Sequence, residues 1–376
     1  MYFSNRMKNK ILVFFLIYIL IIPAKLFAQL GSASMVKSGL DDANKLFGAY
    51  VSPMLTGWSS GLNNSWFNTA KSLGTGGFAL TLSGGGFFVP PEAQTYNPLR
   101  LNLENARPSY GVDASSAPTL FGTTSDGPKM EVFYRTPPPL SEDFPVGSFN
   151  LPGGYGYYFF PTIPNIQLSL GIIKNTELML RFIPGINLGG IQTHVFGFGV
   201  KHDIIQWIPM MRDWKFNLSF VAAYSTSNAE YLIPEESRLY PDDYSYPNAR
   251  EKSYYDNQKF GYESQASLLG FVVSKDIKFI TPYAGFSYNK TFIRFQVLGN
   301  YPMPVYDPTQ SVLTPTIQNV IDPIALENKD NAWRANLGVK FKLWYFTLHG
   351  EYTVARYNTL TAGIGFNLQS LYPFER

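Results

Sequence analysis

The residues best suited to acid–base chemistry are three histidines, His194, His202 and His349. His349 and Glu351 are two positions apart in a stretch of alternating polar and apolar residues, so a β-strand would place both on its polar face. A histidine beside a carboxylate could act as a general base. No serine shares that face in a position to pair with the histidine, and we favour a solvated pair in a polar interior. We therefore predict no catalytic residues and no enzymatic activity.

The composition excludes several other kinds of site. The sequence contains no cysteine, which removes disulfides, thiolate metal sites and cysteine nucleophiles. Acidic pairs at 235–236 and 242–243 lack the ligand spacing of a calcium loop, so we predict no metal and no cofactor. No basic cluster of the kind that binds nucleic acid is present, and we expect no nucleic-acid partner.

The elements that position His349 and Glu351 are three consecutive strands near the C-terminus. From Trp333 to Leu343 every odd residue is apolar, while the even residues are polar, charged or glycine. The alternation resumes with opposite parity at Phe346 and again in the run that ends at Leu368. Strands of about ten residues with one apolar face are the length that a membrane-spanning barrel needs. Only 15% of the residues are charged and 16% are aromatic, which fits this class.

A barrel of this kind would turn a set of charged residues toward its lumen. These residues could line a constriction or hold a plug by salt bridges, or they could simply solvate a water-filled interior, which is the interpretation we favour. The lumen candidates are Glu177, Arg181, Lys201, Arg294, Arg334, Lys340, Lys342, His349 and Glu351.

The N-terminus has the pattern of a secretory signal peptide. Arg6, Lys8 and Lys10 precede an apolar run that ends at Ile22, and Ala28 offers a small residue for cleavage. Four of the 30 basic residues lie in residues 1–28, so the remainder carries 26 basic and 27 acidic residues and is nearly neutral. We predict three parts: a signal peptide (1–28), an N-terminal helical plug segment (29–73) and an outer-membrane barrel with long loops (74–376).

The predicted plug segment has apolar residues at helical spacing up to Tyr50, and Pro53 is expected to end the helix. A small, polar and aromatic stretch follows. Such a segment could fold into the lumen, lie on the periplasmic side, or form a loose amphipathic leader. The plug candidates are Phe47, Tyr50, Trp58, Trp66 and Phe67.

Further alternating runs predict an all-β, antiparallel, up-and-down transmembrane barrel of about 12–14 strands. The interpretation separates a strand at 279–288 from one at 291–299, and counts another at 130–135. It then places three strands between the long loops 225–260 and 301–329, which would put these loops on opposite sides of the membrane. Because long loops normally share one side, we expect a counting error within residues 90–160 or 260–300.

Several stretches resemble a known family. They are residues 57–71, Gly77–Thr81, Thr176–Pro184, Gly197–Pro209 and Tyr357–Phe366. Together they are similar to an uncharacterised family of outer-membrane β-barrel proteins from Bacteroidota-type bacteria. The resemblance implies an outer-membrane barrel and no particular activity. A looser architectural likeness connects the chain to long-chain fatty-acid transporters, which also hold a folded N-terminal segment inside a barrel.

Aromatic residues at predicted strand ends fit the girdles of such a barrel: Trp207, Trp214, Trp344, Tyr345 and Tyr357. We expect the protein to reside in the bacterial outer membrane, in contact with its lipid. The favoured function is passive transport or binding of a small ligand, including an apolar one, through a plugged lumen. The alternative is a non-transporting scaffold or accessory protein for surface-protein export or anchoring, with a partner bound at the loops. A soluble periplasmic β-protein is a third hypothesis.

Overall fold

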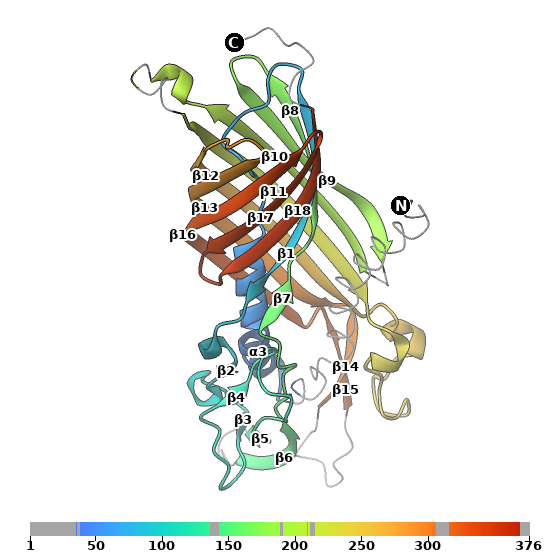
Figure 1. The fold of residues 1–376 in the computed structure, drawn as a ribbon. Helices are drawn as coiled ribbons and strands as arrows, with labels where there is room; N and C mark the ends of the chain where they lie inside the picture. The colour runs from blue at the N-terminus through green and yellow to red at the C-terminus, as the bar shows by residue number, and fades with distance from the viewer. Residues whose placement is uncertain are drawn as a thin grey trace, which may run out of the picture.

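The computed structural model describes Met35, residues 38–135, 143–188 and 191–208, Met210, and residues 215–305 and 316–368. Ten strands form an antiparallel sheet in which the last strand pairs with the first over ten residue pairs, from Phe78–Leu368 to Phe87–Thr359. The sheet is therefore closed into a barrel, as Figure 1 shows. The predicted all-β, up-and-down barrel with a helical N-terminal segment is confirmed. The predicted signal peptide lies outside the described residues.

The barrel strands follow one another around the wall in chain order. They are β1 (Phe78–Phe88), β8 (Asn165–Ile172), β9 (Thr176–Leu188), β10 (Ile191–Asp203), β11 (Asn217–Leu232), β12 (Lys259–Ser274), β13 (Ile280–Leu298), β16 (Ile324–Leu343), β17 (Phe346–Val354) and β18 (Thr359–Leu368). Among the described residues no helix has the length and hydropathy of a membrane span.

The predicted number of strands was too high, and two differences account for the excess. Residues 279–288 and 291–299 belong to a single strand, β13, which pairs continuously with β12 and β16. Residues 130–135 form a strand, but it lies in a separate small sheet outside the barrel. With this correction only β12 and β13 separate the two long loops, so both lie at the same end of the barrel.

The two ends of the barrel differ strongly. One end, here called the long-loop face, carries the connections 89–164, 233–258 and 299–323. The other, the short-turn face, carries the turns 173–175, 275–279 and 344–345 and the connection 204–216. The turn between β8 and β9 has positive φ at Lys174 and Asn175, +55° and +49°, as the tight turns that join twisted strands require.

The connection 89–164 is a small folded domain, here called the loop domain. Its short strands are β2 (Thr95–Tyr96), β3 (Ala106–Pro108), β4 (Ala117–Pro118), β5 (Lys129–Arg135), β6 (Asp143–Asn150) and β7 (Phe159–Pro161), with 3₁₀ turns at Pro91–Ala93 and Pro98–Arg100. Strand β3 pairs with β5, and β5 pairs with β6. Leu120, Phe121 and Leu151 are fully buried in its core. This region is therefore an ordered domain, where the sequence predicted an elaborated loop.

The N-terminal helix, α3 (Leu40–Gly61), joins the loop domain to the barrel. The prediction that Pro53 ends the helix was wrong, because the helix continues for eight residues beyond it. An internal proline costs a helix about 3 kcal/mol or more. Packing offsets this cost: a Cβ at Gly57 would lie 2.2 Å from the Phe87 ring, so only glycine allows this close approach to β1.

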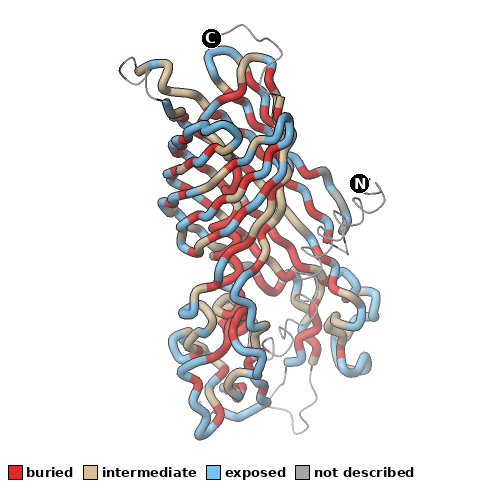
Figure 2. Tube along the Cα trace, viewed as in Figure 1, coloured by how far each residue is buried: buried red, intermediate tan, exposed pale blue. Residues whose placement is uncertain are grey.

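Strand β13 shows how the barrel wall changes character along its length. Near the short-turn face Phe286 and Tyr288 point outward and are exposed, while Ser287 and Asn289 point inward. Near the long-loop face the polarity changes: Ile293, Phe295 and Val297 point inward and are buried, and the outward positions between them are polar, Arg294 and Gln296. Figure 2 shows the alternation of buried and exposed residues along the strands. The interior near the long-loop face is apolar because α3 fills it. There Phe47 packs on Phe295 with ring centroids 6.1 Å apart.

One buried carboxylate attaches α3 to the loop domain. Asp42 is fully buried and accepts backbone N–H groups from Glu104 (2.7 Å), Asn105 (2.8 Å) and Ala106 (2.9 Å). About two turns later in the helix, the Tyr50 hydroxyl donates to Gly153 O at 2.8 Å, and burial raises the pKa of this hydroxyl above its usual value. The helix and the loop domain therefore form one packed unit.

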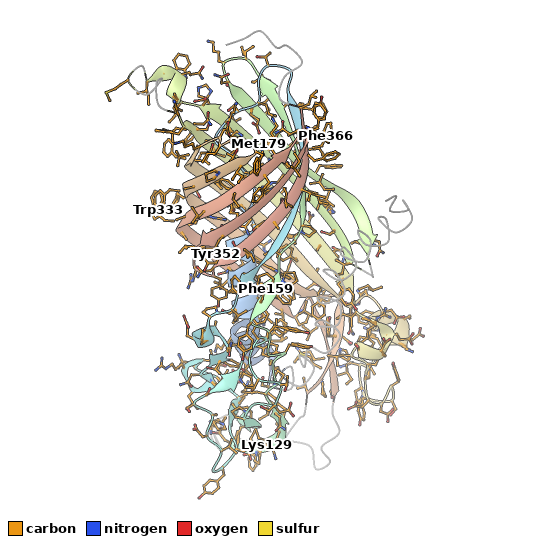
Figure 3. The ribbon with its side chains drawn as sticks, viewed as in Figure 1. Lys129, Phe159, Met179, Trp333, Tyr352 and Phe366 are labelled. Atoms are coloured by element: carbon orange, nitrogen blue, oxygen red, sulfur yellow. The ribbon has the colours of Figure 1, made fainter. Side chains whose placement is uncertain are left out.

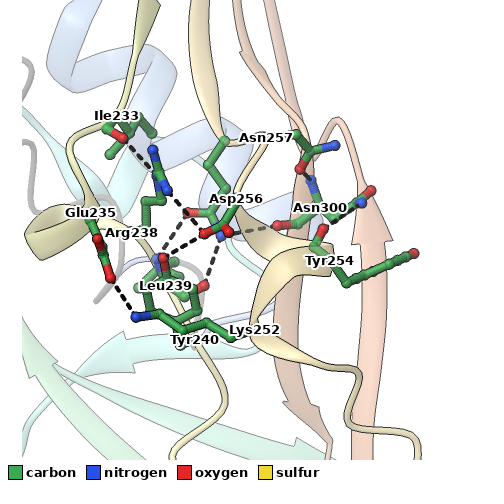
Figure 4. A network of polar contacts seen from close by, with 11 residues as sticks. Ile233, Glu235, Arg238, Leu239, Tyr240, Lys252, Tyr254, Asp256, Asn257 and Asn300 are labelled. Atoms are coloured by element: carbon green, nitrogen blue, oxygen red, sulfur yellow. Dashed lines mark hydrogen bonds and ion pairs between the residues drawn. The ribbon is translucent and has the colours of Figure 1, made fainter.

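The other two long connections are also tied together. Figure 4 shows the contacts of Asn300, whose backbone N–H donates to Asn257 Oδ1 at 2.9 Å and whose side chain donates to Tyr254 O at 2.8 Å. The buried Gln258 side chain also donates to Leu239 O (2.7 Å) and to Asn300 O (3.0 Å). Asn300 belongs to β14 (Asn300–Val305), which pairs with β15 (Thr316–Ile321); 3₁₀ turns lie at Glu235–Ser237 and Lys252–Tyr255. Lys252 donates to Glu235, and this bond lowers the pKa of the Glu235 carboxyl. Within the described ranges no three potential ligand side chains gather as they would around a metal ion.

Replacing Asp42 is expected to loosen the loop domain without opening the barrel. In Asp42→Asn an amide N–H₂ would face backbone donors, and each lost charge-assisted bond is worth about 1.5–3 kcal/mol. Limited proteolysis should cut residues 89–164 much faster in this variant. The barrel should stay folded, so that unheated and heated samples still differ in electrophoretic mobility. Asp41→Asn is the matched control, because Asp41 is exposed and forms only a surface ion pair with Lys45. Equal proteolysis of both variants would contradict the assigned role.

Candidate functional site

The lumen holds the N-terminal segment along its whole length, and this filled lumen is the candidate site. Helix α3 begins among the residues of the loop domain, and Gly61 at its end lies against Thr162, beside the start of β8. The chain then continues as an irregular segment, residues 62–77, here called the lumen segment, and enters β1 at the short-turn face. The chain thus crosses the barrel from the long-loop face to the short-turn face before it builds the wall.

The layer of the lumen nearest the long-loop face is apolar. Trp58 on α3 stacks edge-on against Tyr262 of β12, with centroids 5.1 Å apart, and its indole N–H donates to Pro161 O at 3.3 Å. Burial of a large aromatic side chain stabilises by about 1.5–3 kcal/mol. This layer closes the space between the helix and the wall.

The middle layer is polar and is centred on Arg181 of β9, which is 2% exposed. Its guanidinium donates to Asn64 O at 2.7 Å and to Gln167 Oε1 at 3.0 Å. The same group lies over the Trp66 ring, 3.7 Å from its centroid, as a cation–π contact. A backbone carbonyl and an aromatic ring of the lumen segment are therefore both held by one wall residue.

A second buried arginine binds the same asparagine from the opposite part of the wall. Arg334 of β16 donates to the Asn64 side-chain oxygen and to Ser60 O, the latter at 3.3 Å. Glu351 of β17 is 2% exposed and accepts from Asn336 Nδ2 at 2.9 Å. The opposite charges of the arginines and this glutamate thus lie in one hydrogen-bonded layer.

The third layer of the lumen lies nearest the short-turn face and opens toward it around a cavity of about 250 Å³. Lys201 and Glu177 form a buried ion pair of 2.9 Å, and Glu177 also accepts the Leu73 N–H at 3.3 Å. Lys340 donates to Asn68 Oδ1 at 3.0 Å. Phe67 fits against the wall because residue 285 is glycine, where a Cβ would lie 2.6 Å from the ring.

Most predicted lumen residues lie inside the wall, and one does not. Buried in the interior are Glu177, Arg181, Lys201, Arg334, Lys340, His349 and Glu351, and Lys342 lines the cavity. Arg294 points outward; its side chain is 40% exposed and pairs with Glu327 at 2.8 Å. The prediction for Arg294 was wrong because the interior is apolar at that height, where α3 replaces water.

All five predicted plug residues are buried: Phe47, Tyr50, Trp58, Trp66 and Phe67. Sequence reasoning missed Asn64, Asn68, Gln167 and Asn336, which make the polar contacts between the lumen segment and the wall or within the wall. Single amides in a polar stretch carry no spacing signal that could have found them. His349 is 1% exposed and both of its ring nitrogens lack a hydrogen-bond partner, so it is not paired with Glu351 as a general base would be.

The predicted girdle residues also divide. Trp207, Trp344 and Tyr345 are exposed near the short-turn face, at 61%, 89% and 55%. Tyr357 is buried against Phe87, 6.0 Å between ring centroids, so its assignment to a girdle was wrong. Trp214 lies outside the described residues. Toward the long-loop face Trp333 and Tyr352 project from the outer wall instead (Figure 3).

Comparison with protein families gives one match over residues 7–368, to a family of unknown function, DUF6588. The chain belongs to this family. The predicted membership in an uncharacterised family is confirmed, and DUF6588 brings no assigned activity with it. No curated protein matches the chain.

Several solved barrels are similar in fold to this DUF6588 chain. The outer-membrane protease OmpT from Escherichia coli is 10% identical, with a TM-score of 0.26 over 79% of this chain and 95% of OmpT. The translocator domain of the autotransporter NalP from Neisseria meningitidis is 10% identical, with a TM-score of 0.27 over 89% and 99%. A Pseudomonas aeruginosa FadL homologue is 7% identical, with a TM-score of 0.18 over 78% and 89%. No activity follows from likenesses this distant.

Removing the Arg181 guanidinium is expected to release the lumen segment from the wall. Arg181→Met loses both hydrogen bonds and the contact with Trp66, and hydrogen bonds to a charged group contribute about 1.5–3 kcal/mol each. In planar bilayers the unmodified protein should carry little current, whereas Arg181→Met should show frequent open steps. Arg294→Met, on the outer wall, is the control and should remain closed. A folded Arg181→Met barrel as quiet as the control would contradict this role.

Proposed function

We propose that the protein is an outer-membrane barrel with a permanently filled lumen that serves as a scaffold, holding the folded loop domain at the cell surface. The observation that carries this proposal is the continuity of α3: one helix forms part of the loop-domain core and also fills the lumen near the long-loop face. A loop domain attached in this way is held rigidly relative to the membrane.

The outer wall supports a membrane location. The side chains of Leu337, Leu343 and Leu348 are more than half exposed on it. Contiguous apolar side chains exposed in this way are unfavourable in water, and they indicate a surface that is covered by lipid or by another protein. From Trp333 in β16 to Trp344, the residue after the strand, the chain spans about 35 Å along the strand direction and roughly 25 Å along the barrel axis after a tilt of about 40°. This matches the height of the apolar band of outer-membrane barrels.

The loop lengths support the orientation. Outer-membrane barrels place short turns in the periplasm and long loops outside the cell. The three long connections share one face, so the loop domain and residues 233–258 and 299–323 would face the exterior. The described residues of these connections are where a protein partner would bind.

Passive transport of a small ligand, including an apolar one, is the second candidate function. It requires the lumen segment to move, because Asn64, Trp66 and Phe67 occupy the barrel between the two arginines and the cavity. The closed current level expected of the unmodified protein separates the two functions, since a steady current would favour transport.

Cysteine labelling on intact cells tests the orientation. Because the sequence contains no cysteine, only the introduced residue can react. Asp113→Cys in the loop domain should react with a membrane-impermeant maleimide on whole cells. Lys174→Cys, in the turn between β8 and β9, should react only after the outer membrane is permeabilised. Both positions are exposed, so the reversed pattern would contradict the proposed orientation.

A further inference from the structure

The cavity at the short-turn face, here called the vestibule, has an excess of positive charge. Five lysines line it: Lys71, Lys201, Lys278, Lys340 and Lys342. Two carboxylates accompany them, Glu177 and Asp276, so the lining carries a net charge of +3.

Both carboxylates are already engaged. Glu177 pairs with Lys201 at 2.9 Å, and Asp276 pairs with Lys71 at 3.5 Å while accepting the Thr281 hydroxyl at 2.8 Å. Lys340, by contrast, is buried at 7% exposure and donates to the neutral side chain of Asn68. A buried ammonium group without a carboxylate partner is costly, and an anion in the vestibule would offset that cost.

The size and lining of the vestibule define the class of ligand. A cavity of about 250 Å³ has room for several water molecules and therefore for a small organic anion. Carboxylate and phosphate oxygens are the natural acceptors for lysine ammonium groups. An apolar ligand would leave these donors without acceptors.

We propose that the vestibule binds a small free anion carrying carboxylate or phosphate groups. The anion enters from the short-turn face, where Lys71, Asp276 and Lys278 are exposed, and rests near Lys340. Trp66 and Arg181 close the lumen beyond it, so the site binds the anion and does not pass it on. This binding goes beyond the scaffold function and does not depend on it.

Calorimetric titration of the detergent-purified full chain tests the proposal. Citrate and inorganic phosphate, at constant ionic strength, should each bind saturably. Lys278→Gln combined with Lys342→Gln removes two of the five lysine charges that line the vestibule and should weaken citrate binding at least tenfold. Lys290→Gln combined with Lys329→Gln, on the outer wall, is the matched control and should leave binding unchanged.

Three results would overturn the proposal. The first is the absence of saturable binding by either anion, and the second is equal affinity in the vestibule and outer-wall variants. The third concerns the source of the anion, for which a water-soluble short-chain phosphatidylglycerol is titrated in parallel. Binding of this lipid without binding of citrate or phosphate would assign the site to a lipid headgroup.

Discussion

Two guanidinium groups inside the barrel, those of Arg181 and Arg334, both bind Asn64, and the path of the N-terminal chain depends on this contact. An irregular segment inside a closed barrel exposes backbone groups that must find partners, because unpaired buried polar groups are costly. The wall supplies these partners from β8, β9, β10, β11 and β12. Most backbone groups of α3 bond within the helix, apart from Ser60 O, which accepts from Arg334, and the wall around the helix turns apolar residues inward.

The same division explains the outer surface. Around the polar part of the lumen, from its middle to the short-turn face, the outward residues are apolar, as a barrel in lipid requires. Around α3, polar residues such as Arg294 and Gln296 point outward from β13, and Arg294 pairs with Glu327 there. The barrel is therefore a membrane-type structure at its short-turn end and resembles a soluble β-protein with a helical core at its long-loop end. The loop domain continues this soluble part.

The period-two alternation predicted the barrel and the inward position of Arg181, Lys201, Arg334 and Lys340, because side-chain direction along a strand is fixed by backbone geometry. It failed in the middle of β13, where Asn289, Lys290 and Thr291 are polar on both faces. The polar lumen layer and the edge of the outer apolar band coincide at this point, so the strand looks like a turn. The helix beyond Pro53 and the contacts of Asn64 depend on tertiary packing, which local sequence does not encode.

The most direct test of this account asks whether the lumen segment lies against the inner wall near the short-turn face. The side-chain oxygens of Thr69 and Ser274 are 3.2 Å apart, so cysteines at both positions should form a disulfide on mild oxidation. Thr69→Cys with Ser227→Cys is the control. Ser227 lies eight residues along β11 from Ser219, which contacts Ala70, and is therefore about 26 Å away. The account predicts a cross-link in the first pair alone, measured by mass spectrometry of the digested protein. A reduced first pair in a folded barrel, or equal cross-linking of both pairs, would contradict it.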